Sequence, residues 1–201
     1  MSFNLWYRRL VLLLSLLFVL VVSLIFLKSA AIDFDSKSWF RNQVKIGSEQ
    51  APIELIIFED ILCEECKNFF LHIFPLVQKN YINTDLIRFI WVPIEAVGNS
   101  DPVITNILCL NQISSQTALD FLKTYFESEE TASLEASTHT CPHAPNTKDF
   151  LEKNLIMAEK MMQGIVEIPT IFIQGKKLDD VGYLSIQKEI DKLLLEKGLK
   201  K

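Results

Sequence analysis

The sequence predicts an α/β domain with a helical insertion, preceded by an apolar N-terminal segment. The fold class follows from two compact apolar runs, Ile53 to Phe58 and Leu86 to Val92, and from the stretch of helical periodicity that separates them. Strand, helix, strand is the opening of an α/β domain, because neighbouring parallel strands need a crossover connection.

Length and composition allow one such domain with its own core. The chain has 201 residues, of which 49% are hydrophobic and 22% charged. All 25 acidic residues and 17 of the 20 basic residues follow Ala31, which gives this part a net charge of -8. That charge argues against nucleic acid as a partner.

Residues 1–31 are predicted to be a membrane anchor or a signal segment. The run from Leu10 to Leu27 is apolar except for two serines, and as a helix it reaches roughly 27 Å, near the thickness of the hydrocarbon core. Arg8 and Arg9 precede the run, so the positive-inside rule places the rest of the chain outside the cytoplasmic membrane. The cysteines are then expected in an oxidising, periplasmic or other extracytoplasmic compartment.

Ser29 and Ala31 form a small-x-small pair, so a cleaved secretory signal is the competing interpretation. We favour a retained signal-anchor, because the apolar run is longer than the h-region of an ordinary signal peptide. In both cases the domain is exported.

The exported part begins with a polar linker, residues 32–45, that leads into an edge strand; the domain itself is expected over 46–201. Ile53 to Phe58 reads as a central strand and Leu86 to Val92 as its parallel neighbour. The stretch between them, Cys63 to Asn80, has helical periodicity, and Pro75 inside it predicts a kink.

A helical insertion, about residues 100–164, is expected next. Its three amphipathic stretches are Asp101 to Ile113, Ser115 to Ser128 and Asn146 to Gln163. The sheet then resumes as a hairpin, in which Ile171 to Ile173 and Lys177 to Leu178 flank Gln174-Gly175-Lys176, and a closing helix runs from Leu184 to Glu196.

The reactive site is expected at Cys63-Glu64-Glu65-Cys66, where the first predicted strand ends and a helix begins. Unpaired amides and the helix dipole favour a negative group at that position, which predisposes Cys63 to ionise. The spacing brings both sulfurs together in the first turn, with Cys63 exposed and Cys66 more buried as the resolving thiol. No metal or other cofactor is required.

Other interpretations of a C-x-x-C pair stay open, namely half of a zinc or iron–sulfur site, or a structural disulfide. A four-thiolate site would have to recruit the distant Cys109 and Cys141. Those two cysteines most simply form a structural disulfide across the insertion, although Cys109 lies on an apolar stripe and could be an inert core thiol. His139, Cys141 and His143 gather near one another, but their segment is too short to enclose a metal alone.

Ile168-Pro169-Thr170 lies immediately before the late strand. In isolation it is a proline that enters a strand. Opposite the two thiols, a cis proline would present a free backbone edge to a substrate chain.

These residues resemble the DsbA-like thioredoxin-fold oxidoreductases of the bacterial envelope, over Gly47 to about Lys197. The most specific part is Gly47, Ala51-Pro52, the strand, Asp60, the C-x-x-C pair and Phe69, together with Pro75, the helical insertion and the Ile168-Pro169-Thr170 loop. The resemblance implies a thioredoxin-like fold, Cys63 as nucleophile, Cys66 as resolving thiol, and Ile168 with Pro169 as a substrate-facing loop. It also implies a membrane partner that recycles the pair.

The sequence departs from this family in two places. Strong oxidants of the family typically carry Pro-His between the cysteines, whereas two carboxylates, Glu64 and Glu65, stand here and oppose thiolate formation. A weaker oxidant or a reductant is therefore predicted. The buried acid that is often found six residues before the nucleophile is replaced by Ile57. Glu59 or Asp60 could substitute for it as proton acceptor, but both are expected to be solvated residues at the strand end.

The sequence thus predicts an enzyme, a thiol-disulfide oxidoreductase that acts on exported proteins through Cys63 and Cys66. The alternative function is a thioredoxin-fold module that binds metal or acts as a chaperone without redox turnover.

Overall fold

The computed structural model describes residues 11–17, 42–98, 101–128, 141 and 146–199. The chain divides into two units, residues 1–41 and 42–201. In the first unit, residues 11–17 form an exposed helix, and the rest of the predicted anchor lies outside the described residues. Across the described ranges, no helix has both the length and the apolar character needed to cross a membrane.

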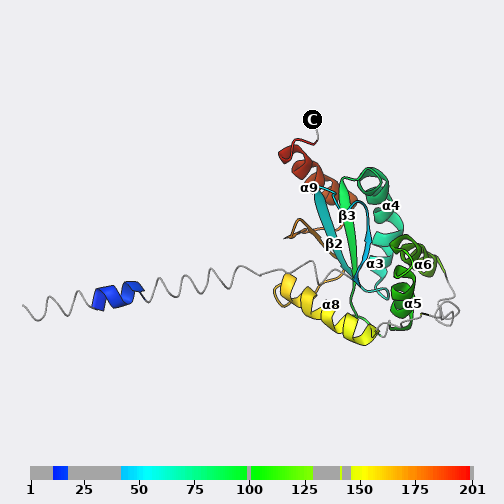
Figure 1. Ribbon diagram of the computed structural model, residues 1–201, viewed down its shortest axis with the longest axis horizontal. Coiled ribbons are helices and arrows are strands. Elements are labelled where there is room, and N and C mark those ends of the chain that lie inside the picture. Colours follow the sequence, from blue (N-terminus) through cyan, green and yellow to red (C-terminus); the bar gives the residue numbers. More distant parts are fainter. Residues whose placement is uncertain (1–10, 18–41, 99–100, 129–140, 142–145, 200–201) are drawn as a thin grey trace, which may run out of the picture. The chain divides into compact units, whose positions relative to one another are not determined.

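The second unit is built on a five-stranded sheet with the order β1-β3-β2-β4-β5. The strands are β1 (Val44–Ile46), β2 (Ile53–Glu59), β3 (Ile87–Pro93), β4 (Thr170–Ile173) and β5 (Lys176–Lys177). β2 and β3 are parallel, as predicted, with Ile53 opposite Ile87, and they lie at the centre of the sheet (Figure 1). β1, β4 and β5 pair antiparallel, and β1 is the edge strand expected after the linker.

One helical run connects β2 to β3. It comprises α3 (Glu64–Asn68), η2 (Phe69–Ile73), α4 (Phe74–Val77) and η3 (Gln78–Ile82). Pro75 has no amide hydrogen to donate to the preceding turn, so the α-helical ladder is interrupted there. The irregularity expected at Pro75 is accompanied by a π-helical turn, η2, directly before α4.

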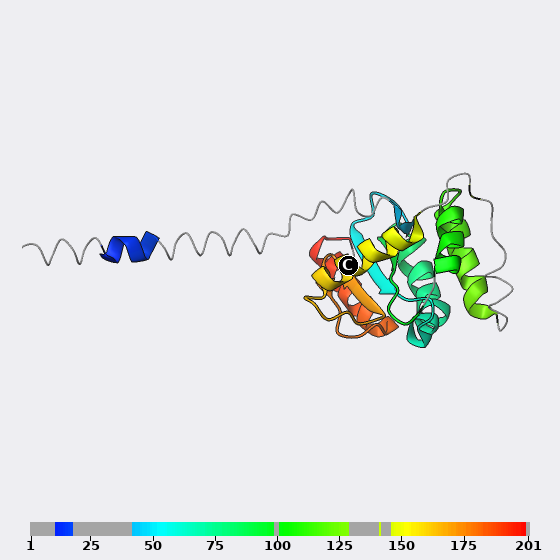
Figure 2. The ribbon, with the colours of Figure 1, turned by 90° about the horizontal axis from the view of Figure 1, so that it is seen from below.

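The insertion contains the three predicted helices, α5 (Asp101–Asn111), α6 (Ser115–Glu127) and α8 (Thr147–Met161). α6 begins where the Ser114 side chain accepts a hydrogen bond from the Thr117 amide, and Asn146 caps α8 in the same way. α9 (Tyr183–Glu196) closes the chain beside η3, where the Tyr81 hydroxyl donates to Asp191. Figure 2 shows α8 on the opposite side of the sheet from the α3–η3 run.

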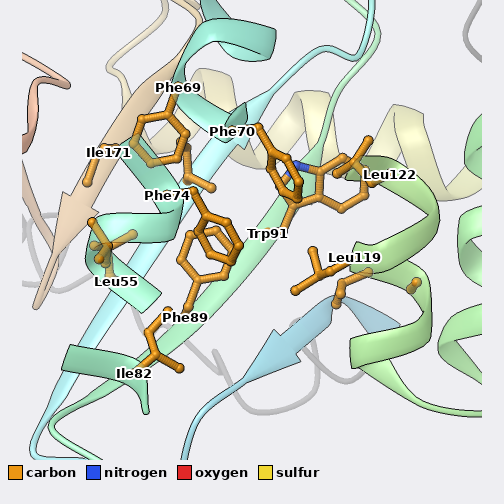
Figure 3. Packing of buried hydrophobic residues seen from close by; sticks show 14 of the residues in the cluster. Leu55, Phe69, Phe70, Phe74, Ile82, Phe89, Trp91, Leu119, Leu122 and Ile171 are labelled. Carbon is orange, nitrogen blue, oxygen red and sulfur yellow. The ribbon is translucent and has the colours of Figure 1, made fainter. Parts of the chain in front are cut away.

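The core between the sheet and the α3–η3 run is aromatic. Phe70 and Phe74 stack with their ring centroids 4.9 Å apart, and Phe74 also lies 4.7 Å from Phe89 of β3 (Figure 3). Leu119 and Leu122 of α6 complete this layer. Burying each such side chain stabilises the fold by about 1.5–3 kcal/mol, so the core holds η2 and α4 firmly on β3.

The hairpin differs from the prediction by one residue. β5 is Lys176–Lys177, not Lys177–Leu178. The reason is the turn: Gln174 and Gly175 both take positive φ, 49° and 78°, so they form a two-residue loop and Lys176 already pairs with Ile173.

Candidate active site

The two cysteines of the C-x-x-C pair lie at the start of α3, directly after β2. Cys63 is the N-cap residue of α3, in extended conformation, and its carbonyl accepts a hydrogen bond from the Lys67 amide at 3.0 Å. Its side chain is half-buried, less exposed than predicted, while Cys66 is completely buried, and the predicted order of the two is confirmed. Both are free thiols. The pair therefore has one accessible and one inaccessible sulfur.

The pKa of the buried Cys66 thiol is raised above its ordinary value. Burial is the main cause, because a thiolate in this apolar environment loses its hydration. The carboxyl group of Glu59 raises the pKa further through its charge, and the Cys63 side chain does so through a hydrogen bond. Cys66 can therefore act as a nucleophile only if a neighbouring group takes its proton.

Glu59 is the acidic side chain that lies close to Cys66. The expectation that Glu59 is solvated is wrong: only 1% of this residue is exposed, and the Trp91 indole Nε1 donates to its Oε2 at 2.7 Å. Burial raises the pKa of Glu59 to about 8, against a smaller opposing effect of the Trp91 hydrogen bond. Its other oxygen, Oε1, has no hydrogen-bond partner among the described residues.

The position of Glu59 explains how the chain does without an acid at Ile57. Successive side chains of a strand point to opposite faces, so residues two apart in β2 share a face. Glu59 thus lies on the same face as Ile57, two residues closer to Cys63 along the strand. The buried carboxyl is present in the fold, displaced by two residues.

Asp60 was also expected to be solvated, and that expectation is wrong as well. Its side chain is fully buried, and its carboxylate accepts hydrogen bonds from the amides of Leu62, Ala96 and Val97. Backbone donors replace water around this group, which is what allows an acidic side chain to be buried.

The two glutamates between the cysteines are both exposed. The Cys63 thiol donates a hydrogen bond to Glu65 Oε2, at 3.5 Å between sulfur and oxygen. The exposed carboxylate of Glu65 therefore lies directly beside the Cys63 sulfur.

The Ile168-Pro169-Thr170 loop lies at the same end of the sheet as the cysteines. Thr170 of β4 pairs with Phe58 of β2, five residues before Cys63. The peptide bond between Ile168 and Pro169 is cis, the state predicted for a loop that faces the thiols, rather than the trans state usual for a bond before proline. Pro169 and Thr170 also line a cavity of about 460 Å³ along the β4–β5 edge.

The sulfur atoms of Cys109 and Cys141 are bonded to each other, with 5.5 Å between their Cα atoms, which is the connectivity expected from the sequence. Cys141 is therefore not free to ligate a metal, and His139 and His143 lie outside the described residues. Within the described part of the chain, no cluster of histidine, cysteine and acidic side chains is suited to a metal ion.

Both the sequence and the fold of the chain are similar to those of known proteins. The family model described as Thioredoxin matches residues 41–192. A stretch of 52 residues is 35% identical to disulfide bond formation protein D of Bacillus subtilis, over 26% of this chain and 23% of that protein. The chain thus matches about a quarter of the length of this curated relative.

Solved structures share the fold over most of the domain. BdbD from Bacillus subtilis, in its oxidised form, is 24% identical, with a TM-score of 0.65 over 78% of this chain and 95% of that one. Chlamydia trachomatis DsbA is 22% identical, with a TM-score of 0.64 over 78% and 94%. A linker-deletion variant of Proteus mirabilis ScsC is 21% identical, with a TM-score of 0.66 over 92% and 90%. The thioredoxin-like fold with a helical insertion is therefore confirmed.

Proposed function

The chain belongs to the thioredoxin family, and from that premise we propose that it is a DsbA-like thiol-disulfide oxidoreductase in which Cys63 is the nucleophile and Cys66 the resolving thiol. The observation that carries the proposal is the asymmetry of the pair. Cys63 is accessible at the head of α3, Cys66 is buried, and a buried carboxyl group, Glu59, lies close enough to Cys66 to perturb its ionisation.

The reduction of a substrate proceeds in two exchanges. The Cys63 thiolate attacks one sulfur of a substrate disulfide, so a bond between Cys63 and the substrate forms, the substrate disulfide breaks, and the departing sulfur takes a proton from solvent. Cys66 then passes its proton to Glu59 and attacks the Cys63 sulfur. The Cys63–Cys66 disulfide forms, the bond between Cys63 and the substrate breaks, and the departing sulfur takes a proton from solvent, so the substrate leaves as a dithiol. Oxidation of a dithiol substrate is the same sequence reversed.

Glu59 is suited to the proton step by its environment. A proton acceptor works best when its pKa lies near the working pH, and burial brings the pKa of Glu59 to about 8. The Trp91 hydrogen bond fixes one carboxylate oxygen at 2.7 Å, which leaves Oε1 available for a proton. Ile57, at the position where related proteins often carry the acid, could not serve.

The direction of the reaction follows from the groups around Cys63. The Cys63 thiol donates a hydrogen bond to Glu65 Oε2, and Glu64 places a second negative charge beside the sulfur. A less stabilised thiolate means a more stable disulfide and a lower reduction potential. The couple is therefore a weak oxidant or a reductant, and a measured potential near that of the strong oxidants, about -120 mV, would contradict this part of the proposal.

The substrates are exported proteins that carry thiols or disulfides, and the chain works on the outer side of a cytoplasmic membrane. The apolar run from Leu10 to Leu27, with Arg8 and Arg9 in front of it, supports export and an anchored N-terminus. The loop formed by Ile168, Pro169 and Thr170 is the substrate-facing edge, because it reaches the same end of the sheet as Cys63. A membrane redox partner would return the pair to its working state.

The direct test is insulin reduction by the full-length chain, compared between wild type and the Cys63→Ser and Cys66→Ser variants. Wild type should catalyse the reaction, and Cys63→Ser should abolish it. Cys109→Ala with Cys141→Ala is the control, because it removes the two cysteines outside the redox pair, and it should retain activity. Equal rates for wild type and Cys63→Ser would reject the proposal.

A further inference from the structure

Asp60 joins the turn that carries Cys63 to a second segment, residues 95–98, which follows β3. Its Oδ1 accepts the Leu62 amide at 2.9 Å, and its Oδ2 accepts the Ala96 and Val97 amides, each at 2.7 Å. Its backbone carbonyl also accepts the Cys63 amide at 3.0 Å. One fully buried residue therefore fixes where the 95–98 segment lies relative to the cysteine.

These hydrogen bonds are among the stronger kinds found in proteins, because the acceptor is a carboxylate. Among the described residues the donors to this carboxylate are backbone amides of two separate segments. A neutral amide in place of the carboxylate would put an NH₂ group against at least one of these N–H donors. The arrangement is therefore specific to an acidic side chain at this position.

The residues joined by Asp60 present apolar surface beside the redox pair. Leu62, the chain neighbour of Cys63, is 40% exposed, and Val97 on the opposite segment is 61% exposed. The two segments touch: a Cβ built on Gly98 would lie 3.0 Å from Leu62 Cδ1. Leu62 and Val97, which we call the apolar edge, thus come from two segments held to one carboxylate.

We infer that Asp60 is a positioning residue for substrate selection, which holds Leu62 and Val97 together as an apolar edge that favours substrates with large apolar residues next to the reacting cysteine. This inference rests on the proposed function. When a substrate cysteine is bonded to the Cys63 sulfur, the residues on either side of that cysteine come close to the residue beside Cys63. Successive residues of an extended chain are only about 3.3–3.6 Å apart. Covering Leu62 and Val97 removes apolar surface from water, which stabilises the mixed disulfide with such substrates.

The test uses the reduced full-length chain and two synthetic peptides, each with one cysteine in mixed disulfide with 5-thio-2-nitrobenzoate. The peptides differ only in the residues on both sides of that cysteine, leucine in one and serine in the other. Attack of Cys63 on the peptide sulfur releases the coloured thiolate, and Cys66 then displaces the peptide thiol, so two electrons pass from the dithiol to the disulfide. The symmetric disulfide of the same reagent, which has no peptide, measures the intrinsic reactivity of Cys63.

Wild type should react on the order of fivefold faster with the leucine peptide, a ratio in the range expected from partly burying two apolar side chains. Val97→Ser and Leu62→Ser should each bring the ratio toward one. Asp60→Asn should do the same, while its rate with the symmetric reagent stays within about twofold of wild type. Ile113→Ser, at an apolar residue 77% exposed on the turn after α5, is the matched control and should keep the wild-type ratio.

The inference fails if Asp60→Asn and Val97→Ser both keep the preference for leucine. It also fails if Asp60→Asn slows all three reagents equally, because the residue would then support only the fold or the thiol. Val97→Ser, at an exposed position, decides the matter if Asp60→Asn does not fold. Loss of reaction with every reagent in wild type would instead reject the proposed function, which keeps the two failures distinct.

Discussion

Replacing Glu59 by glutamine should remove a strong pH dependence from the stability of the fold. The variant keeps a carbonyl oxygen that can accept the Trp91 hydrogen bond, now 2.7 Å long, and loses only the ability to ionise. The pKa of Glu59 is about 8 in the folded chain, because of burial, against an ordinary value of 4.5. Folding therefore favours the protonated form.

The sign and size of the effect follow from that difference. A raised pKa means that stability is complete below about pH 4.5 and is lost as the pH rises toward 8, because the unfolded chain gives up the proton first. At about 1.36 kcal/mol per pKa unit, the full loss is about 5 kcal/mol, and about 4 kcal/mol of it falls between pH 5 and pH 9. Glu59→Gln should lack this loss.

The measurement is urea unfolding of the reduced full-length chain at pH 5, 7 and 9, for wild type and Glu59→Gln. Between pH 5 and pH 9, the free energy of unfolding of the variant should rise by about 4 kcal/mol relative to that of wild type. Glu152→Gln, at an exposed glutamate of α8, is the matched control and should follow wild type. Parallel pH profiles for wild type and Glu59→Gln would refute the assignment of a buried carboxyl group with a raised pKa next to Cys66.

Three further results are expected. Glu65→Gln removes the carboxylate that accepts a hydrogen bond from the Cys63 thiol, and it should raise the reduction potential of the pair on the order of 10–30 mV, measured by equilibration with glutathione. An unchanged potential would show that Glu65 does not tune the redox pair. Gly47→Ala should destabilise the fold by at least about 2 kcal/mol in thermal unfolding, because Gly47 has φ +92° and an added Cβ would lie 2.3 Å from the Ile87 carbonyl oxygen; a wild-type midpoint would contradict this close approach. The Cys109–Cys141 disulfide closes a loop with a sequence separation of 32, so Cys109→Ala with Cys141→Ala should lower the free energy of unfolding in urea by about 3–4 kcal/mol. Unaltered stability would argue against a structural role.

Elements that depend on local pattern could be predicted from the sequence. The apolar runs predicted β2 and β3 to within a residue or two, and amphipathic periodicity predicted the three helices of the insertion. The C-x-x-C pair could be placed at a helix start because strand and helix signals flank it directly. For these features the neighbouring residues along the chain contain the physical cause.

The environment of the two acids could not be predicted in the same way. An acid at the end of a strand is usually solvated, and Glu59 is buried because Trp91, 32 residues later, supplies a donor from the neighbouring strand. Asp60 is buried because Ala96 and Val97 turn their amides toward it after β3. A partial signal existed for Glu59: it continues the alternation of Leu55 and Ile57, whose face of β2 is buried.

The central claim is that the Cys63 sulfur forms a covalent bond with a substrate and that Cys66 then breaks it. Mass spectrometry of the Cys66→Ala chain after incubation with a disulfide-bonded peptide tests this claim most directly. The account predicts a stable adduct whose mass is that of the chain plus one peptide, located at Cys63 and absent from Cys63→Ser. No adduct, or an equal adduct on the Cys63→Ser chain, would contradict it.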